Sequence, residues 1–166
     1  MRSTRHGSVT LTFPSDREVL FTRQFDAPAE LVFDVLTKPE HVRMWFAAKP
    51  LEVCEIDLRV GGEYRFEGFL MDGDDTTCAF RGTYLEIARP VRTVETWVFE
   101  GKPDADAVET MELHEEDGVT TMTTILAFKD QSTRDSITWS GPDGVQAADG
   151  QQVSNDRLED YLATLT

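Results

Sequence analysis

The chain has few of the residues that bind metals or form disulfides, with 2 cysteines and 3 histidines among its 166 residues. Cys54 and Cys78 stand alone in separate segments, without the paired spacing that zinc sites and redox motifs need. The histidines are equally scattered along the chain. We therefore predict two buried, reduced thiols in a cytoplasmic protein, with no metal site and no cofactor.

Basic residues are scarce as well, since 16 lysines and arginines face 31 aspartates and glutamates, for a formal net charge of −15 at pH 7. A surface this acidic repels polyanions. The charge predicts that neither a nucleic acid nor a membrane is a partner. Together with the excess of arginine over lysine, it also suggests a bacterial source.

Long hydrophobic runs are missing, and no segment reaches the roughly 18 consecutive apolar residues of a membrane-spanning helix. Residues 1–8 contain two arginines but no apolar stretch, unlike a signal peptide, and we expect them to form a flexible tail. The hydrophobic content of 40% is enough for one core. Residues 9–166 are therefore predicted to form a single domain.

Motifs of common catalytic sites are absent, because the chain contains no G-x-S-x-G, P-loop or G-x-G-x-x-G sequence. We predict no catalytic residue. Glu86 follows a buried-looking strand and is a candidate cavity acid, although an ion pair at a strand end is favoured. His114 is expected to be exposed, and His41 fits either environment. The acidic turn at residues 72–75 lacks the spacing of an EF-hand and predicts weak surface calcium binding at most.

What the sequence does contain is a change of hydrophobic period along the chain. Two strand-like segments precede two short helical ones, whose first turns suit Pro28 and Pro39. The period then becomes two, with turn residues between segments, and returns to helical after Lys129. The predicted strands are residues 9–13, 17–25, 51–58, 63–69, 77–87, 92–100, 108–116 and 119–128, and the closing helices are 131–141 and 143–165.

This order of elements predicts a cavity. One terminal helix covers only the middle of one face of an antiparallel sheet. If the sheet curls around that helix while the two short helices close one end, a cleft remains between them. The predicted ligand-contacting residues are Trp45, Phe46, Tyr64, Phe66, Phe80, Tyr84, Thr96, Leu158, Tyr161 and Leu162.

Strand alternation supplies these assignments, because every second residue of a strand points to the same face. The cleft face is assigned Tyr64, Phe66 and Gly68, then Phe80, Gly82 and Tyr84, then Val94, Thr96 and Val98. The opposite, wet face receives Glu63, Arg65, Glu67, Arg81, Glu95 and Trp97. A slip of one residue would instead turn Arg65 and Arg81 inward as anion clamps. Gly68 and Gly82 leave room for a ligand or for another backbone. An ordinary packed core is the alternative at every position.

Four runs of the sequence resemble the SRPBCC (START-like, helix-grip) superfamily, and within it the branch named for the activator of heat-shock protein 90 ATPase. The runs are REVLFTRQFDAPAELVFDVLTKPEHVRMWF (17–46), CEIDLRVGGEYRF (54–66), FRGTYLEIARPVRTVETW (80–97) and RLEDYL (157–162). The resemblance implies an α+β helix-grip fold, in which a curved antiparallel sheet of about seven strands surrounds a long C-terminal helix. Two short helices follow the first long strand, and a hydrophobic pocket is enclosed.

The matching positions are mostly those that form the fold, at residues 26–28, 39–45 and 57–62, so they transfer architecture more securely than function. The first hypothesis is non-enzymatic binding of a small apolar or aromatic molecule. The second is an enzyme similar to the aromatase/cyclases of the superfamily, which would need a titratable group deep in the pocket. The third is a protein-interaction module resembling a co-chaperone. Exposed strand edges and Trp139 also suggest a homodimer.

Overall fold

The computed structural model describes residues 9–69, 76–138 and 145–166. The predictions for the tail at residues 1–8, the acidic turn at 72–75 and Trp139 fall outside these ranges. The strands are β1 (Thr10–Thr12), β2 (Glu18–Phe25), β3 (Val53–Ile56), β4 (Glu63–Gly68), β5 (Cys78–Ala88), β6 (Arg92–Phe99), β7 (Ala107–Glu116) and β8 (Val119–Phe128). The helices are α1 (Ala29–Thr37), α2 (Pro39–Trp45), α3 (Gln131–Thr138) and α4 (Val145–Leu165).

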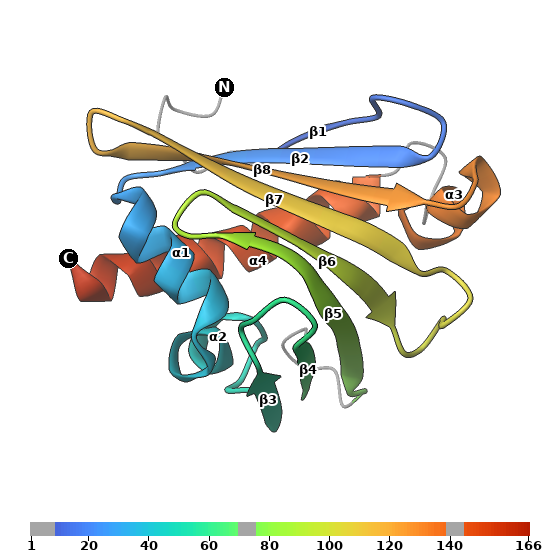
Figure 1. The fold of residues 1–166 in the computed structure, drawn as a ribbon, viewed down its shortest axis with the longest axis horizontal. Coiled ribbons are helices and arrows are strands. Elements are labelled where there is room, and N and C mark those ends of the chain that lie inside the picture. The colour runs from blue at the N-terminus through green and yellow to red at the C-terminus, as the bar shows by residue number, and fades with distance from the viewer. Residues whose placement is uncertain (1–8, 70–75, 139–144) are drawn as a thin grey trace.

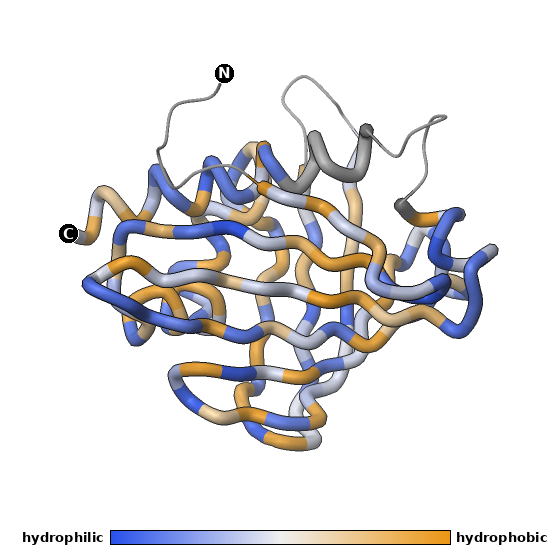
Figure 2. Tube along the Cα trace, turned by 90° about the horizontal axis from the view of Figure 1, so that it is seen from above, coloured by the Kyte–Doolittle hydropathy of each residue, from blue (hydrophilic) through white to orange (hydrophobic). Residues whose placement is uncertain are grey.

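The predicted α+β helix-grip architecture is confirmed (Figure 1). In the described part of the chain, the strands form one sheet of eight in the order β1-β2-β8-β7-β6-β5-β4-β3, with every neighbouring pair antiparallel. Helix α4 runs across one face of this curled sheet, and α1 and α2 stand at one end (Figure 1). Hydrophobic and hydrophilic residues are mixed along the strands, as Figure 2 shows.

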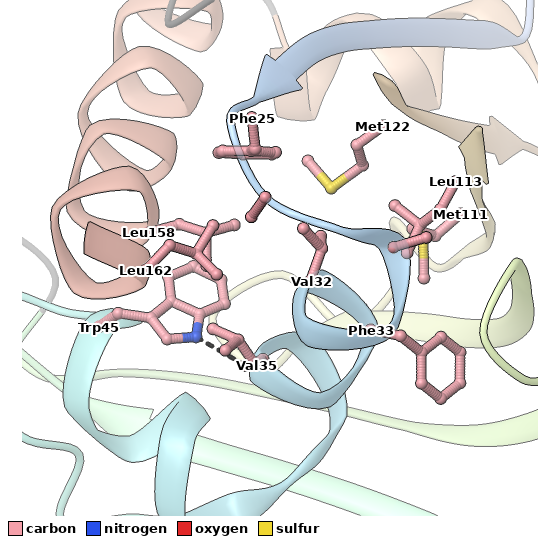
Figure 3. Packing of buried hydrophobic residues seen from close by; sticks show 12 residues of the cluster. Phe25, Val32, Phe33, Val35, Trp45, Met111, Leu113, Met122, Leu158 and Leu162 are labelled. Atoms are coloured by element: carbon pink, nitrogen blue, oxygen red, sulfur yellow. Dashed lines mark hydrogen bonds between the residues drawn. The ribbon is translucent and has the colours of Figure 1, made fainter. Parts of the chain in front are cut away.

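Helices α1 and α2 are separate because a proline stands at their junction. Lys38 has an extended conformation, with φ −90° and ψ 129°, as expected for a residue whose successor is a proline. The break turns α2 back toward α1, so that the Trp45 Nε1 group donates a hydrogen bond to the Val35 carbonyl oxygen at 2.9 Å (Figure 3). The two short helices therefore pack as one unit.

The main hydrophobic core lies where α1, α2 and the last turns of α4 meet the sheet. Figure 3 shows Leu158 and Leu162 of α4 beside Trp45. The fully buried Leu158 and the nearly buried Leu162 each contribute about 1.5–3 kcal/mol by leaving water. Other members of this core are Phe25, Ala27, Ala29, Val32, Phe33, Val35, Met111, Leu113 and Met122. The end of α4 is thus fixed to the sheet by ordinary close packing.

Two local features set the register of the strands. Asp117 and Gly118 join β7 to β8 with φ values of 53° and 80°, and a two-residue type I′ turn needs positive φ at both positions. Between Tyr84 and Glu86 the pairing of β5 with β6 shifts by one residue, which is a β-bulge. Leu85 is the extra residue, and its side chain is 48% exposed. The bulge decides which residues of these two strands face inward.

Candidate functional site

A cavity of about 430 Å³ lies between the inner face of the sheet and α4. This volume is within the usual range of sites for small molecules. Described residues of six strands and four helices line the cavity. Most of the protein surface that faces it is apolar. Aromatic side chains form much of the wall: Phe21, Trp45, Phe46, Tyr64, Phe66, Phe80, Tyr84 and Trp97.

Six of the predicted ligand-contacting residues border this cavity. They are Trp45, Phe46, Tyr64, Phe66, Phe80 and Tyr84. Their rings touch in sequence, with centroid separations of 5.0 Å between Phe46 and Phe66, 5.2 Å between Phe66 and Tyr64, and 5.5 Å between Tyr64 and Tyr84. The alternation assigned to β4 and β5 therefore places the intended rings on the cavity side. Their contact with a ligand stays a prediction.

The three predicted residues near the end of α4 do not line the cavity. Leu158 and Leu162 are buried in the main core. Tyr161 packs against that core, and its hydroxyl forms a hydrogen bond of 2.7 Å with Nδ1 of His41. The cavity instead meets α4 one turn earlier, at residues 153–155 and 157. The most apolar stretch of the helix was expected at the cavity, but apolar residues of this kind are more stable in close packing against α1 and α2.

On β6 the predicted face is wrong by one residue. Glu95 pairs with Tyr84 on one side and with Glu109 on the other, and paired residues share a face. The cavity is therefore lined by Thr93, Glu95 and Trp97, in place of Val94, Thr96 and Val98. Both alternating sets contain apolar residues, so hydropathy alone does not distinguish the two faces of this strand.

Thr96 supports the wall without lining it. Its carbonyl oxygen accepts a hydrogen bond from the Tyr64 hydroxyl at 2.8 Å, and its hydroxyl accepts one from the Thr83 amide at 2.8 Å. Gly82 makes this arrangement possible, because a Cβ there would overlap the Thr96 carbonyl oxygen and lie 2.7 Å from the Tyr64 ring. The space beside Gly82 is therefore filled by protein atoms.

Gly68 has a similar explanation, since a Cβ at this position would lie 2.9 Å from Cδ2 of Leu51. The loop before β3 packs directly on this part of β4. Neither of the glycines that suggested room for a ligand thus opens into the cavity. Each permits close approach of another segment, which was the alternative explanation.

The arginines of the outer face form ion pairs across strands, as the sequence predicted, although their shared partner is Glu100 and not Glu95, which was assigned to this face. Arg65 donates hydrogen bonds of 2.8 and 3.0 Å to the two carboxylate oxygens of Glu100, and Arg81 lies 3.6 Å from the same group. Glu86 is exposed and forms a 3.0 Å ion pair with Arg92, so it is a strand-end charge and not a cavity acid.

The remaining candidates from the sequence also lie away from the cavity. His114 is 79% exposed, as predicted, and His41 contacts Tyr161 outside the lining. Cys54 and Cys78 are only partly buried, which corrects the expectation of full burial. Burial raises the pKa of the Cys54 thiol to about 11. Within the described ranges, no group of three or more His, Cys, Asp or Glu is placed to hold a metal ion.

The residues that sequence reasoning missed are two glutamates, Glu95 of β6 and Glu109 of β7. They are directly paired across the two strands, and both line the cavity. Side chains in such positions have Cβ atoms about 4.5–5.5 Å apart. Glu95 is only 7% exposed and accepts a hydrogen bond of 3.0 Å from the Thr93 hydroxyl. Among the described residues, no donor forms a hydrogen bond with the Glu109 carboxyl group.

Both carboxyl groups hold their protons more tightly than usual. Burial and the neighbouring Glu109 raise the pKa of Glu95 to about 8, against a smaller lowering by the Thr93 hydroxyl. Burial raises the pKa of Glu109 to about 7. Because these values lie near neutrality, the pair can hold a proton, release it, or hydrogen-bond a ligand in either state.

Among the described residues, three other ionisable groups face the cavity. Tyr64 and Tyr84 have raised pKa values, chiefly because of burial and then because of the two glutamates, so both phenols stay protonated. Arg157 lines the cavity from α4. The pKa shifts of the two glutamates arise without a contribution from any cation. The sheet side of the cavity thus carries two carboxyl groups, and the helix side carries the guanidinium group of Arg157.

The sequence carries one ambiguous signal for the glutamate pair. Glu95 and Glu109 each sit in a segment of strand that carries apolar or hydroxyl residues on both sides, at VETW and VETM. Charged residues are equally common on solvated strand faces, so the pattern alone is ambiguous. Only the register of β6 against β7 brings the two carboxyl groups together inside the fold.

A comparison with protein families shows which family this chain belongs to. Residues 26–163 match the model of the family described as activator of Hsp90 ATPase homolog 1-like protein. The chain belongs to this family. The match extends over α1, α2, the sheet from β3 to β8 and nearly all of α4, so it includes most of the cavity wall. No curated protein matches the chain significantly.

Several solved structures share the fold of this domain. A Rhodobacter sphaeroides protein has a TM-score of 0.81 and 20% identity, covering 96% of this chain and 100% of its own. Protein CV1439 from Chromobacterium violaceum has a TM-score of 0.67 and 26% identity, covering 88% of this chain and 96% of its own.

A third solved structure is that of DynU16, a protein described as belonging to the dynemicin biosynthetic locus. It has a TM-score of 0.64 and 22% identity, and the match covers 91% of this chain but 48% of DynU16. At these identities the similarity shows a shared architecture. Family membership therefore accounts for the fold of the domain, and its function has to be argued from the cavity.

In the part of the chain that the structure describes, no helix combines the length and the apolarity that crossing a bilayer requires.

Proposed function

We propose that this domain binds a small, largely apolar aromatic molecule in the cavity between the sheet and α4, without transforming it. The observation that supports this most is the wall of aromatic rings around a volume of about 430 Å³. Closely packed protein interiors rarely leave a space of this size. Binding of an apolar ligand in a cavity lined by aromatic rings is favourable, because it removes apolar surface from water.

Different parts of α4 stabilise the fold and line the cavity. Leu158 and Leu162 fix the end of α4 in the main core, while the cavity meets the preceding turn of the helix. The cavity is not needed to hold the helix in place. This division permits a preformed site, and preformed sites lose little free energy to ordering when a ligand binds.

The test is a calorimetric titration with 1-naphthylmethanol, an uncharged aromatic probe, together with native mass spectrometry for any retained ligand. Thr124 of β8 lines the cavity, whereas its neighbour Thr123 points to the other face of the sheet. We expect Thr124→Phe to weaken binding at least tenfold by filling the cavity, and Thr123→Phe to bind like the natural chain. Absence of binding, or equal binding by both variants, would contradict the proposal.

The glutamate pair favours a second candidate, an acid–base enzyme similar to the aromatase/cyclases. Such an enzyme orients a reactive chain and transfers protons, and Glu95 and Glu109 have pKa values suited to this at neutral pH. The biosynthetic locus of DynU16 is compatible with this candidate. Incubation with a linear poly-β-ketone should then yield a cyclised product with the natural chain but not with Glu95→Gln. No product from the natural chain would remove the candidate.

A further inference from the structure

Among the described residues, the acidic side of the cavity has no counter-charge of its own. Glu95 and Glu109 lie opposite each other on β6 and β7, and both reach the cavity. Two like charges in this position repel each other, and burial adds the loss of hydration. A proton or a cation must therefore compensate at least one of them. Among the described lining residues the one cationic side chain is that of Arg157, which lies on α4 and makes no contribution to the pKa shift of either glutamate.

Aromatic rings surround the same space. Tyr64, Phe80 and Trp97 line the sheet side together with the two glutamates. The faces of such rings attract cations, most strongly when water is excluded. The hydroxyl of Tyr64 already donates to the Thr96 carbonyl oxygen, so it is not committed to either glutamate. The described residues on this side of the cavity thus offer a cation two carboxyl groups and several aromatic rings, and they offer an anion no positive charge.

The charge of the whole chain acts in the same direction. Its formal net charge of −15 raises the local concentration of cations and lowers that of anions. This long-range field favours the approach of a positively charged molecule even before it reaches the cavity.

We infer that the ligand of this cavity is an organic cation, an aromatic or apolar body bearing a protonated amine, with its nitrogen held between Glu95 and Glu109. This inference rests on the proposed binding function and specifies the chemical class of its ligand. Entry of the ammonium group expels a proton from the carboxyl pair to solvent, so that one positive charge replaces another. Binding is accordingly coupled to proton release.

Three probes of matched size test the inference: 1-naphthylmethylamine as the cation, 1-naphthylmethanol as the neutral form and 1-naphthoic acid as the anion. Each is titrated calorimetrically into the full chain at pH 7.5. We expect the amine to bind at least tenfold more tightly than the alcohol, and the acid more weakly than both. Titrations in buffers of different ionisation enthalpy should show proton release with the amine only.

Three variants locate the effect. Glu95→Gln and Glu109→Gln preserve side-chain size and should reduce amine affinity at least tenfold, to near that of the alcohol, while alcohol affinity changes less than twofold. Glu112→Gln, on the exposed face of β7, removes the same charge outside the cavity and should alter neither. Thermal melting of each variant verifies folding, and removing the repulsion should not lower the melting temperature of the first two.

The outcomes separate the two proposals. If the alcohol binds in the cavity and the amine binds no more tightly, the inferred ligand class is wrong and the binding function stands. Amine preference that survives both glutamine substitutions would also overturn the inference, because it would place the cation elsewhere. If none of the three probes binds, the proposed function fails and the inferred ligand class fails with it.

Discussion

Burial makes the ionised form of Glu95 unfavourable in the folded chain, and this single residue should affect stability in a pH-dependent way. Its pKa is about 8 in the folded state against an ordinary value of 4.5. Below pH 4.5 both states are protonated, and the residue has no effect. Between pH 4.5 and 8 the unfolded chain releases the proton and the folded chain keeps it, so stability falls as the pH rises.

We therefore predict that Glu95→Gln stabilises the protein at pH 8.5 by on the order of 3 kcal/mol, or roughly 6–12 °C in melting temperature. At pH 5 the gain should be much smaller, because little of the penalty has developed. Thermal unfolding of both chains at the two pH values measures this. A gain that is the same at both pH values, or is also shown by Glu112→Gln, would mean that the carboxyl group of Glu95 is not buried as described.

At the scale of single residues, sequence reasoning succeeded where one face of a strand was clearly apolar. In β4 the rings of Tyr64 and Phe66 alternate with charged Arg65, so the inward face was evident. In β6 apolar residues occur on both faces, and the correct choice needs the pairing of Glu95 with Glu109. Side-chain alternation is a property of one strand, whereas register is a property of two.

Among the elements, α4 has a polar attachment as well as an apolar one. Arg23 of β2 is 1% exposed, and its Nη1 lies 2.9 Å from Asp156 Oδ1, while its Nη2 lies 3.2 Å from Glu159 Oε1. Both acids are on α4, one turn apart. A guanidinium buried this deeply depends on these two carboxylates for compensation.

Removing both acids should therefore lower the free energy of unfolding more than removing Arg23 does. The double variant Asp156→Asn/Glu159→Gln leaves a buried cation without its carboxylates and should lower the free energy of unfolding by about 3–5 kcal/mol. Arg23→Met, which leaves two partly exposed acids, should cost clearly less. Urea denaturation of the three chains compares them, and an equal or larger cost for Arg23→Met would refute this description of the ion pair.

The elements themselves were the most predictable part of the chain. Pro28 and Pro39 correctly indicated where the short helices begin, and the predicted strands 108–116 and 119–128 correctly left two residues, Asp117 and Gly118, for the turn between β7 and β8. Local backbone preferences act within a few residues, so the sequence displays them directly. The part of α4 that faces the cavity was not predictable, because it depends on how far the packed end of the helix extends.

At the scale of the whole molecule, the cavity exists because the sheet is larger than the helices that cover it. Leu158 and Leu162 hold α4 against one end of the sheet, and the inner faces of β4, β5 and β6 curl past it. The family to which the chain belongs accounts for this architecture. The predicted homodimer, the cytoplasmic location and the exclusion of nucleic acids and membranes as partners stay predictions.

The most direct measurement of the central claim is a crystal structure of the full chain determined with and without 1-naphthylmethylamine. We predict an open cavity in the free protein, and in the complex a naphthyl ring against Phe66 and Tyr64 with its nitrogen within hydrogen-bonding distance of Glu95 or Glu109. A cavity closed by side chains, with the amine bound elsewhere or not at all, would contradict the account.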